Sequence, residues 1–273
     1  MRAGWNGAPA PVPPPLTLAD RARFCWRAPL AFFWLLGCFA VFLPLAFLDR
    51  ALSRRGDAAG APAMVRIWAR GALRLLGLRA EARGAPMAAP GALVANHSSW
   101  LDIVALQSAA RVFFVSKAEV GSWPLIGFIG HAIGTEFIER RATEAGRQAR
   151  ALGARLALGD RLCLFPEGTS SDGQRVLPFK SSLFAVFLDG ATGPELRVQP
   201  VTLRYRPRAD LPAALYGWWG EMDFGAHLGS LLARSTGGQV EITFHEPLDP
   251  RALGDRKTLS AAAEAATRRG FDA

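Results

Sequence analysis

Residues 91–102 read GALVANHSSWLD, and this stretch decides the fold. Its short apolar run, residues 92–95, is followed at once by polar residues and then by a helical pattern over residues 99–109. Short apolar runs bounded by polar or turn residues are typical of buried strands. The stretch therefore predicts a strand that passes through a short polar loop directly into a helix.

His97 and Asp102 within this stretch are five residues apart. On a continuous helix they would point roughly 140° apart, so the side chains can meet only if His97 precedes the helix. Ser98 or Ser99 can cap that helix, whose N-terminus also favours the Asp102 carboxylate. A carboxylate on one imidazole nitrogen leaves the other free to take a proton from a hydroxyl. We therefore predict His97 as a general base and Asp102 as its orienting partner.

The pattern of short apolar runs and helical stretches continues to the end of the chain. Further strands are predicted at residues 111–115, 161–165, 197–205 and 239–245. Further helices are predicted at residues 143–158, 179–190, 226–235 and 258–269. Such alternation predicts an α/β fold, with a mixed central sheet flanked by helices. Catalytic side chains should then lie on loops at strand ends.

A second polar motif follows the predicted strand at residues 161–165. Residues 164–171 read LFPEGTSS, so an acid, a glycine and hydroxyl residues follow the strand directly. Such a turn can form the floor of a site for a polar headgroup. We predict that Glu167, Gly168, Thr169 and Ser170 take part in substrate binding.

Residues 29–48 form an uncharged apolar run of 20 residues with arginines on both sides. That length just spans a bilayer core as a helix. Pro44 lies near its end, where a kink or break would let the helix embed without crossing. A cleaved signal peptide is the alternative, but the run is longer than usual for one and a Pro-rich stretch precedes it.

Residues 64–78 place Arg66, Arg70 and Arg74 on one helical stripe, largely opposite to apolar side chains. This pattern predicts a basic amphipathic helix, either lying at lipid headgroups after a turn at residues 56–62 or packed on the domain. Twelve arginines and four acids lie in residues 1–90, within a chain of net charge +9. Because this basic segment is interleaved with apolar sequence, we predict membrane lipid and no nucleic acid as its partner.

The expected domain organisation has three parts. A Pro-rich, basic N-terminal segment covers residues 1–28, membrane-anchoring helices cover residues 29–80, and a catalytic domain covers residues 81–273. Cys25, Cys38 and Cys163 are widely spaced and lack a CxxC pairing, so we interpret them as buried, small apolar side chains.

Four blocks of this sequence resemble the glycerolipid acyltransferase family that includes bacterial 1-acylglycerol-3-phosphate acyltransferase. They are, in the family's order, NHSSWLD at residues 96–102, GTEFIERR at 134–141, FPEGTSS at 165–171 and VQPVTLRY at 198–205. Matches in context and order carry more weight than one short motif. The hydrophobic N-terminal helices fit the same family.

This resemblance implies direct acyl transfer from acyl carrier protein or acyl-CoA to the hydroxyl of a lysolipid, without a metal or other cofactor. It implies that Glu167 and Gly168 shape the acceptor site and that Lys117 and Arg140 contact an anionic headgroup. Pro200 belongs to the fourth block, near the oxyanion region. An Ala- and Arg-rich chain with only three Lys suggests a GC-rich bacterial genome, and hence the inner membrane with a cytoplasmic active site.

Ser170 departs from the family pattern, because members that make phosphatidate usually carry Arg there. An uncharged residue removes a bidentate phosphate donor. The stretches SSDGQRVLPFKSSLF and WWGEMDFGAHLGSLL resemble the branch that acylates lyso-ornithine lipid, and Asp172 could meet a substrate ammonium. Lyso-ornithine lipid and 1-acyl-glycerol-3-phosphate both remain open as acceptors.

Two other functions compete with acyl transfer. A serine lipase or thioesterase would use His97 with a serine nucleophile, but the sequence contains no G-x-S-x-G elbow. A non-catalytic, membrane lipid-binding module would use the same motifs only to hold a headgroup. Replacement of His97 by Ala distinguishes these functions, because only the enzyme loses acyl transfer while it retains lipid binding.

Overall fold

The computed structural model describes residues 5, 7–9, 11–52, 60–123, 126–138, 145–188 and 195–273. Within this part of the chain, strands form one seven-stranded sheet in the order β1-β7-β6-β2-β5-β3-β4. The strands are β1 Leu78–Arg83, β2 Gly91–Ala95, β3 Phe113–Lys117, β4 Glu136–Ile138, β5 Arg161–Leu164, β6 Arg197–Arg206 and β7 Gly238–Phe244.

Strand directions make this a mixed sheet, which confirms the predicted fold class. The β2 strand pairs in parallel with both β5 and β6, whereas β6 and β7 are antiparallel. The two strands that the sequence pattern missed, β1 and β4, lie at the two sheet edges. Four of the six β1 positions are exposed, so this edge strand lacks the apolar run that marks a central strand.

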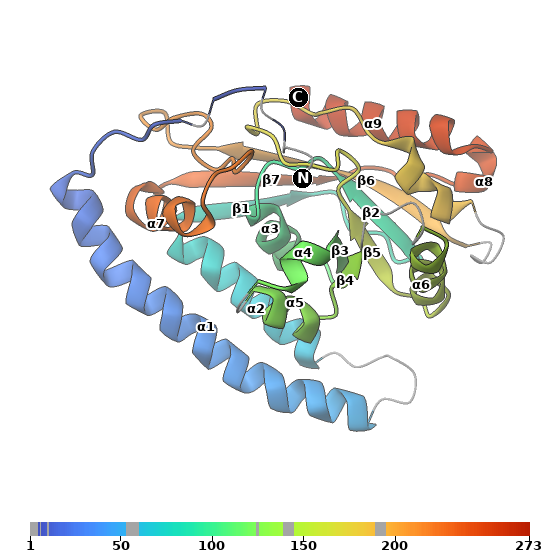
Figure 1. Cartoon of the computed structure of the whole chain (residues 1–273), viewed down its shortest axis with the longest axis horizontal. Helices are drawn as coiled ribbons and strands as arrows, with labels where there is room; N and C mark the ends of the chain where they lie inside the picture. The colour runs from blue at the N-terminus through green and yellow to red at the C-terminus, as the bar shows by residue number, and fades with distance from the viewer. Residues whose placement is uncertain are drawn as a thin grey trace.

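Helices cover both faces of the sheet (Figure 1). One core joins the sheet to α2 Gly60–Leu75, α3 Leu101–Ala109 and α7 Phe224–Arg234. The other core joins it to α6 Ala145–Ala157, η2 Ser181–Phe187 and α9 Arg256–Asp272. The shorter helices are α4 Ala118–Gly121, α5 Ile126–Ala132 and α8 Pro250–Leu253.

The segment at residues 179–190 differs from its predicted α-helix. It forms a 3₁₀-helix over Ser181–Phe187, and residues 189–190 lie outside the described part. Phe184 and Phe187 are both buried in the second core. A 3₁₀-helix aligns positions three residues apart, so it brings both phenyl rings to the sheet.

Helix α1, Leu18–Leu52, is longer than the predicted apolar run and continues through Pro29 and Pro44. It is held along the domain rather than projecting from it (Figure 1). Arg27 donates to the Ser235 carbonyl at 2.6 Å, and the Trp34 indole donates to the Trp68 carbonyl at 3.1 Å. By length and composition α1 is the described helix that could cross a membrane.

Helix α2 begins at Gly60, so residues 60–62 of the expected turn are helical while residues 56–59 lie outside the described part. The helix ends at Leu75, and Leu78 already starts β1. Ala69 and Leu73 are buried against the sheet core, whereas Arg70 and Arg74 are exposed. Helix α2 therefore packs on the domain and keeps Arg70 and Arg74 in solvent, whereas Arg66 of the same stripe is partly buried.

Candidate active site

His97 and Asp102 meet at the junction of β2 and α3, as the spacing predicts. Strand β2 ends at Ala95 and α3 begins at Leu101, so His97 lies in the connecting loop. His97 Nδ1 is 2.8 Å from Asp102 Oδ2. The His97 side chain is 20% exposed and that of Asp102 is 0% exposed. Asp102 thus holds the imidazole from the protein interior, while part of the ring faces solvent.

Backbone N–H groups orient the Asp102 carboxylate. Its Oδ2 accepts hydrogen bonds from the amides of Ser98 at 2.7 Å and Ser99 at 2.9 Å. The expected serine cap is weaker, since Ser99 Oγ accepts from the Leu101 amide at 3.3 Å. These two amides belong to the loop before α3, so the carboxylate that binds His97 also fixes the conformation of that loop.

The ring of Phe165 supports the imidazole on one face. The centroids of His97 and Phe165 are 4.1 Å apart and their planes differ by 16°. Phe114 stacks behind Phe165 with centroids 6.1 Å apart. With Nδ1 engaged by Asp102 and one face covered, the His97 Nε2 edge is left to receive a proton. Phe165 begins the second predicted motif, but sequence reasoning did not assign it this role.

The two predicted motifs are in direct contact. The Ser171 amide donates to the His97 carbonyl at 3.0 Å. Gly168, three residues before Ser171, has φ of +73°, and a Cβ at this position would lie 2.5 Å from Lys180 Nζ. Gly168 therefore both permits the turn and makes room for Lys180, a cationic side chain at this motif that the sequence pattern did not single out.

Glu167 lies beneath the site. It is 2% exposed, and its Oε1 accepts from the Leu177 amide at 3.1 Å. Burial raises the pKa of Glu167 to about 9, against the opposing effect of hydrogen bonds from the Leu177 and His97 backbone. The Glu167 carboxyl is therefore protonated at neutral pH. It contacts the His97 backbone instead of lying on the exposed surface.

The other predicted binding residues are dispersed. Thr169 Oγ1 accepts from the Trp5 amide at 3.0 Å, and Ser170 is partly exposed next to it. Lys117 ends β3, and its side chain is outside the described part, as is all of Arg140. The structure therefore brings the second motif to His97. The two basic side chains predicted to bind the headgroup lie outside the described part.

The Asp172 side chain is too buried to contact a substrate ammonium. It is 5% exposed, and its carboxylate already pairs with Arg175 at 3.0 Å. This is a correction to the sequence-based expectation for Asp172. Because Arg175 is only three residues from Asp172 in the sequence, this local ion pair could have been predicted from the sequence.

Two further residues support the catalytic loop. The Asn96 side chain donates to the Leu203 carbonyl and accepts from the Leu203 amide, both at 2.8 Å, which extends the pairing of β2 with β6. Tyr205 is buried in the same core as α3, and burial followed by the Asp102 charge raises its pKa. Tyr205 comes from the fourth block, and no local signal connects it with Asp102.

The remaining titratable groups near the site are structural. The Trp100 indole donates to His227 Nδ1 at 3.0 Å, and burial lowers the pKa of His227 to about 4. Burial raises the pKa of the Cys163 thiol, so this cysteine is not a nucleophile. Cys38 is also buried as predicted, whereas Cys25 is exposed, which corrects the prediction for that cysteine. Within the described residues, no three His, Cys, Asp or Glu side chains are grouped to hold a metal ion.

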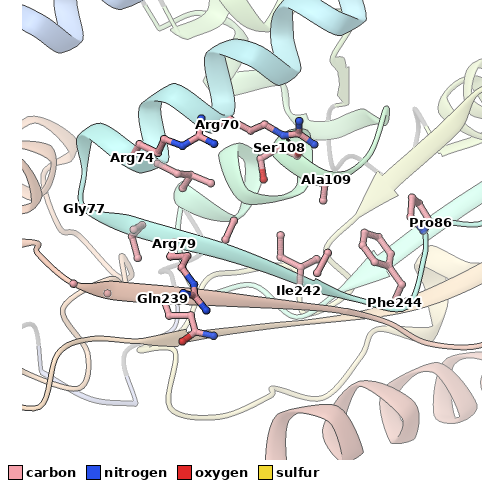
Figure 2. Close-up of a pocket in the computed structure, with 16 residues that line it drawn as sticks. Arg70, Arg74, Gly77, Arg79, Pro86, Ser108, Ala109, Gln239, Ile242 and Phe244 are labelled. Atoms are coloured by element: carbon pink, nitrogen blue, oxygen red, sulfur yellow. Dashed lines mark hydrogen bonds between the residues drawn. The ribbon is translucent and has the colours of Figure 1, made fainter.

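A pocket of about 820 Å³ lies apart from His97, between α2 and the strands β1 and β7 (Figure 2). Arg70 and Arg74 line it from α2, above a floor that includes Ile242 and Phe244. None of the lining residues is acidic, and none belongs to the two catalytic motifs. This pocket is therefore separate from the candidate active site.

Comparison with known proteins places this site in a family. Residues 80–204 match the Acyltransferase family model. The chain is 41% identical to a lyso-ornithine lipid O-acyltransferase of Rhodobacter capsulatus, over 98% of this chain and 96% of that protein. It is 39% identical to a 1-acyl-sn-glycerol-3-phosphate acyltransferase of Neisseria gonorrhoeae, over 50% of this chain and 53% of that one.

The fold is similar to the crystal structure of the 1-acyl-sn-glycerophosphate acyltransferase PlsC from Thermotoga maritima. The TM-score is 0.65 at 22% identity, and the match covers 93% of this chain and 96% of that one. This likeness confirms the mixed α/β architecture.

Proposed function

The chain belongs to the Acyltransferase family as a lysolipid O-acyltransferase, and we propose that it acylates the hydroxyl of lyso-ornithine lipid. The observation that carries the catalytic assignment is the His97–Asp102 pair, joined at 2.8 Å at the end of β2. Family membership supplies the reaction class, and this pair supplies the residues that would perform it.

In the proposed reaction His97 Nε2 removes the proton of the acceptor hydroxyl as its oxygen attacks the thioester carbonyl. Asp102 stabilises the imidazolium that forms, and collapse of the tetrahedral intermediate forms the ester and breaks the carbon–sulfur bond. The imidazolium returns its proton to the departing sulfur, so the products are an ester and a free thiol. A thiol needs little acid assistance as a leaving group, because its pKa is about 8.5.

The acyl donor is a thioester of acyl carrier protein or of coenzyme A. We assign no metal or organic cofactor to the reaction, because a general base and an activated thioester are sufficient for it. Glu167 acts by supporting the His97 loop, and Gly168, Thr169 and Ser170 line the acceptor side. Lys117 and Arg140 stay assigned to an anionic part of the substrate by family resemblance.

Two observations favour the amino-acid headgroup over phosphate. The Rhodobacter relative that matches over nearly the full chain is a lyso-ornithine lipid enzyme, whereas the phosphate-acceptor relative from Neisseria matches over half of this chain. Ser170 also offers no guanidinium to a phosphate group.

Membrane association follows from the family and from α1. Phe32, Phe33 and Phe47 are at least half exposed on this helix. Because α1 lies along the domain, we assign a monotopic attachment in which these side chains enter one leaflet. We assign this leaflet to the cytoplasmic side of the bacterial inner membrane, where thioester donors are made.

The test uses purified full-length protein in lipid vesicles with a labelled acyl thioester. Lyso-ornithine lipid and 1-acyl-glycerol-3-phosphate are supplied in parallel reactions. Acylation of the first acceptor, lost in His97→Ala and retained in Ser98→Ala, supports the proposal. Release of free fatty acid with dependence on Ser98 would instead support a serine hydrolase, and product from the phosphate acceptor alone would refute the choice of headgroup.

A further inference from the structure

The loop at residues 171–175 is fastened directly to the catalytic loop. Besides the Ser171 contact with the His97 carbonyl, the Trp218 amide donates to the Ser98 carbonyl at 2.8 Å. Gly173 has φ of +71°, and a Cβ there would lie 3.3 Å from Ser98 Cβ. The backbone of this loop, and that of the neighbouring loop that carries Trp218, is therefore held against the loop that carries His97.

Arg175 is the exposed member of a rigid ion pair on this loop. Its Nη2 is 3.0 Å from Asp172 Oδ2 and its Nε is 3.3 Å from Asp172 Oδ1. The Asp172 side chain is 6% exposed, whereas that of Arg175 is 53% exposed. One edge of the guanidinium is thus bound to a buried carboxylate. A fixed guanidinium loses little conformational entropy when its other edge binds a ligand.

Trp5, in the N-terminal segment, covers the same guanidinium. The Trp5 ring centroid is 5.3 Å from Arg175 Cζ, and the Trp5 and Trp219 rings are 6.3 Å apart. The Trp5 amide bonds Thr169, and the Trp219 indole donates to the Ala8 carbonyl at 3.0 Å. Residues far apart in the sequence therefore meet around Arg175.

We propose that Arg175, held by its ion pair with Asp172 and covered by the Trp5 ring, binds the carboxylate of an amino-acid headgroup. This inference rests on the proposed function and names residues for its acceptor choice. The ion pair has no net charge, so it suits a zwitterionic head that carries one carboxylate and one ammonium. The aromatic face of Trp5 can accept the ammonium. A phosphate monoester would bring up to two negative charges next to Asp172 without an added cation.

The test combines Arg175→Ala with an acceptor whose headgroup carboxylate is methylated. With the native acceptor, Arg175→Ala should raise KM by about tenfold to a hundredfold, the usual effect of losing a charged hydrogen bond, with kcat little changed. Methylation should raise KM similarly for the unmodified enzyme but add little in Arg175→Ala. Arg175→Lys should restore little, because Lys lacks the planar fork.

Arg208→Ala is the matched control. Arg208 is 51% exposed and, like Arg175, pairs with an acid close to it in the sequence, Asp210. This variant should keep the KM of the unmodified enzyme. Thermal unfolding of each variant shows whether it folds, and Trp5→Ala provides a second variant with an expected KM increase if Arg175→Ala does not fold.

The outcomes separate the inference from the proposed function. Full additivity of the substitution and the methylation overturns the role of Arg175 while acylation of lyso-ornithine lipid stands. An unchanged KM in both Arg175→Ala and Trp5→Ala also overturns the role of Arg175 and leaves the proposed function standing. Failure of the unmodified enzyme to acylate the amino-acid-headed acceptor overturns the proposed function and, with it, the inference.

Discussion

The loop that follows β5 and the pocket under α2 both present arginine to solvent, but they balance its charge differently. Arg175 on the loop is neutralised by a buried Asp172. Arg70 and Arg74 at the pocket have no acidic residue beside them in its lining, and Arg70 donates to the Ser108 carbonyl at 3.0 Å. The lining of the pocket is thus basic, whereas Arg175 on the loop is paired with an acid next to the proposed catalytic pair.

The proposed active site and this pocket therefore lie in different parts of the molecule. The catalytic pair needs a fixed imidazole with one open edge, which the loop at the end of β2 provides. The pocket offers volume and positive charge but no general base within its lining. Substitutions in the two regions should therefore have separable effects.

The largest effect is expected from His97→Ala. Loss of the general base should lower the acyl-transfer rate by about 10² to 10⁴, while lipid binding is retained. Steady-state rates with labelled thioester measure it, and vesicle flotation measures the binding. If His97→Ala kept full activity, the assignment of the catalytic region to the β2–α3 junction would be wrong.

Asp102→Asn should come next. The amide keeps the size of the side chain but removes the charge that stabilises the imidazolium, so we expect kcat to fall by about 10² or more. Its buried contacts with two backbone amides call for a check of the melting temperature. A kcat within twofold of the unmodified enzyme would show that Asp102 only braces the loop.

Ser170→Arg tests whether charge at the second motif selects the headgroup. A guanidinium at this position adds a cation to the second motif and restores the family's phosphate donor. The ratio of kcat/KM for 1-acyl-glycerol-3-phosphate to that for lyso-ornithine lipid should rise by about tenfold. Competition between the two acceptors in one reaction measures the ratio, and Ser170→Gln controls for side-chain size. An unchanged ratio would show that headgroup charge is read elsewhere.

Glu167 makes the stability of the active-site region depend on pH. Its pKa is about 9 in the folded protein and 4.5 as an ordinary value, so between these limits the unfolded chain ionises while the folded chain keeps the proton. Stability should therefore fall as pH rises through this window, by up to about 1.4 kcal/mol per pH unit. Glu167→Gln should lack this slope.

Urea unfolding in detergent at several pH values measures the difference. The free energy of unfolding of Glu167→Gln, relative to the unmodified protein, should increase from about pH 5 to about pH 8. Parallel pH slopes for the two proteins would contradict a buried, protonated Glu167.

The smallest effect on catalysis is expected at the pocket. Arg74→Ala should change the rate of acyl transfer by less than about twofold, because exposed side chains away from the site contribute little. The same assay as for His97→Ala measures it. A loss of activity comparable to that of His97→Ala would instead make the pocket part of the active site.

Local pattern was enough to predict most of the elements that position the site. The apolar runs at residues 92–95 and 197–205 correspond to β2 and β6, and the motifs at His97 and Glu167 follow strand ends as expected. Strand β1 was missed because its residues are mostly exposed at an edge. The 3₁₀-helix was missed because packing of Phe184 and Phe187, and not helix propensity, determines its geometry.

The fold class, the family and the proposed catalytic pair could be predicted from the sequence, because each depends on short-range spacing that one strand and the next few residues contain. What surrounds that pair depends on the tertiary structure. The stacking of Phe165 on His97, the burial of Glu167 and the meeting of Trp5 with Arg175 are contacts between distant segments. Such contacts form when separate elements pack against each other, so no local pattern records them.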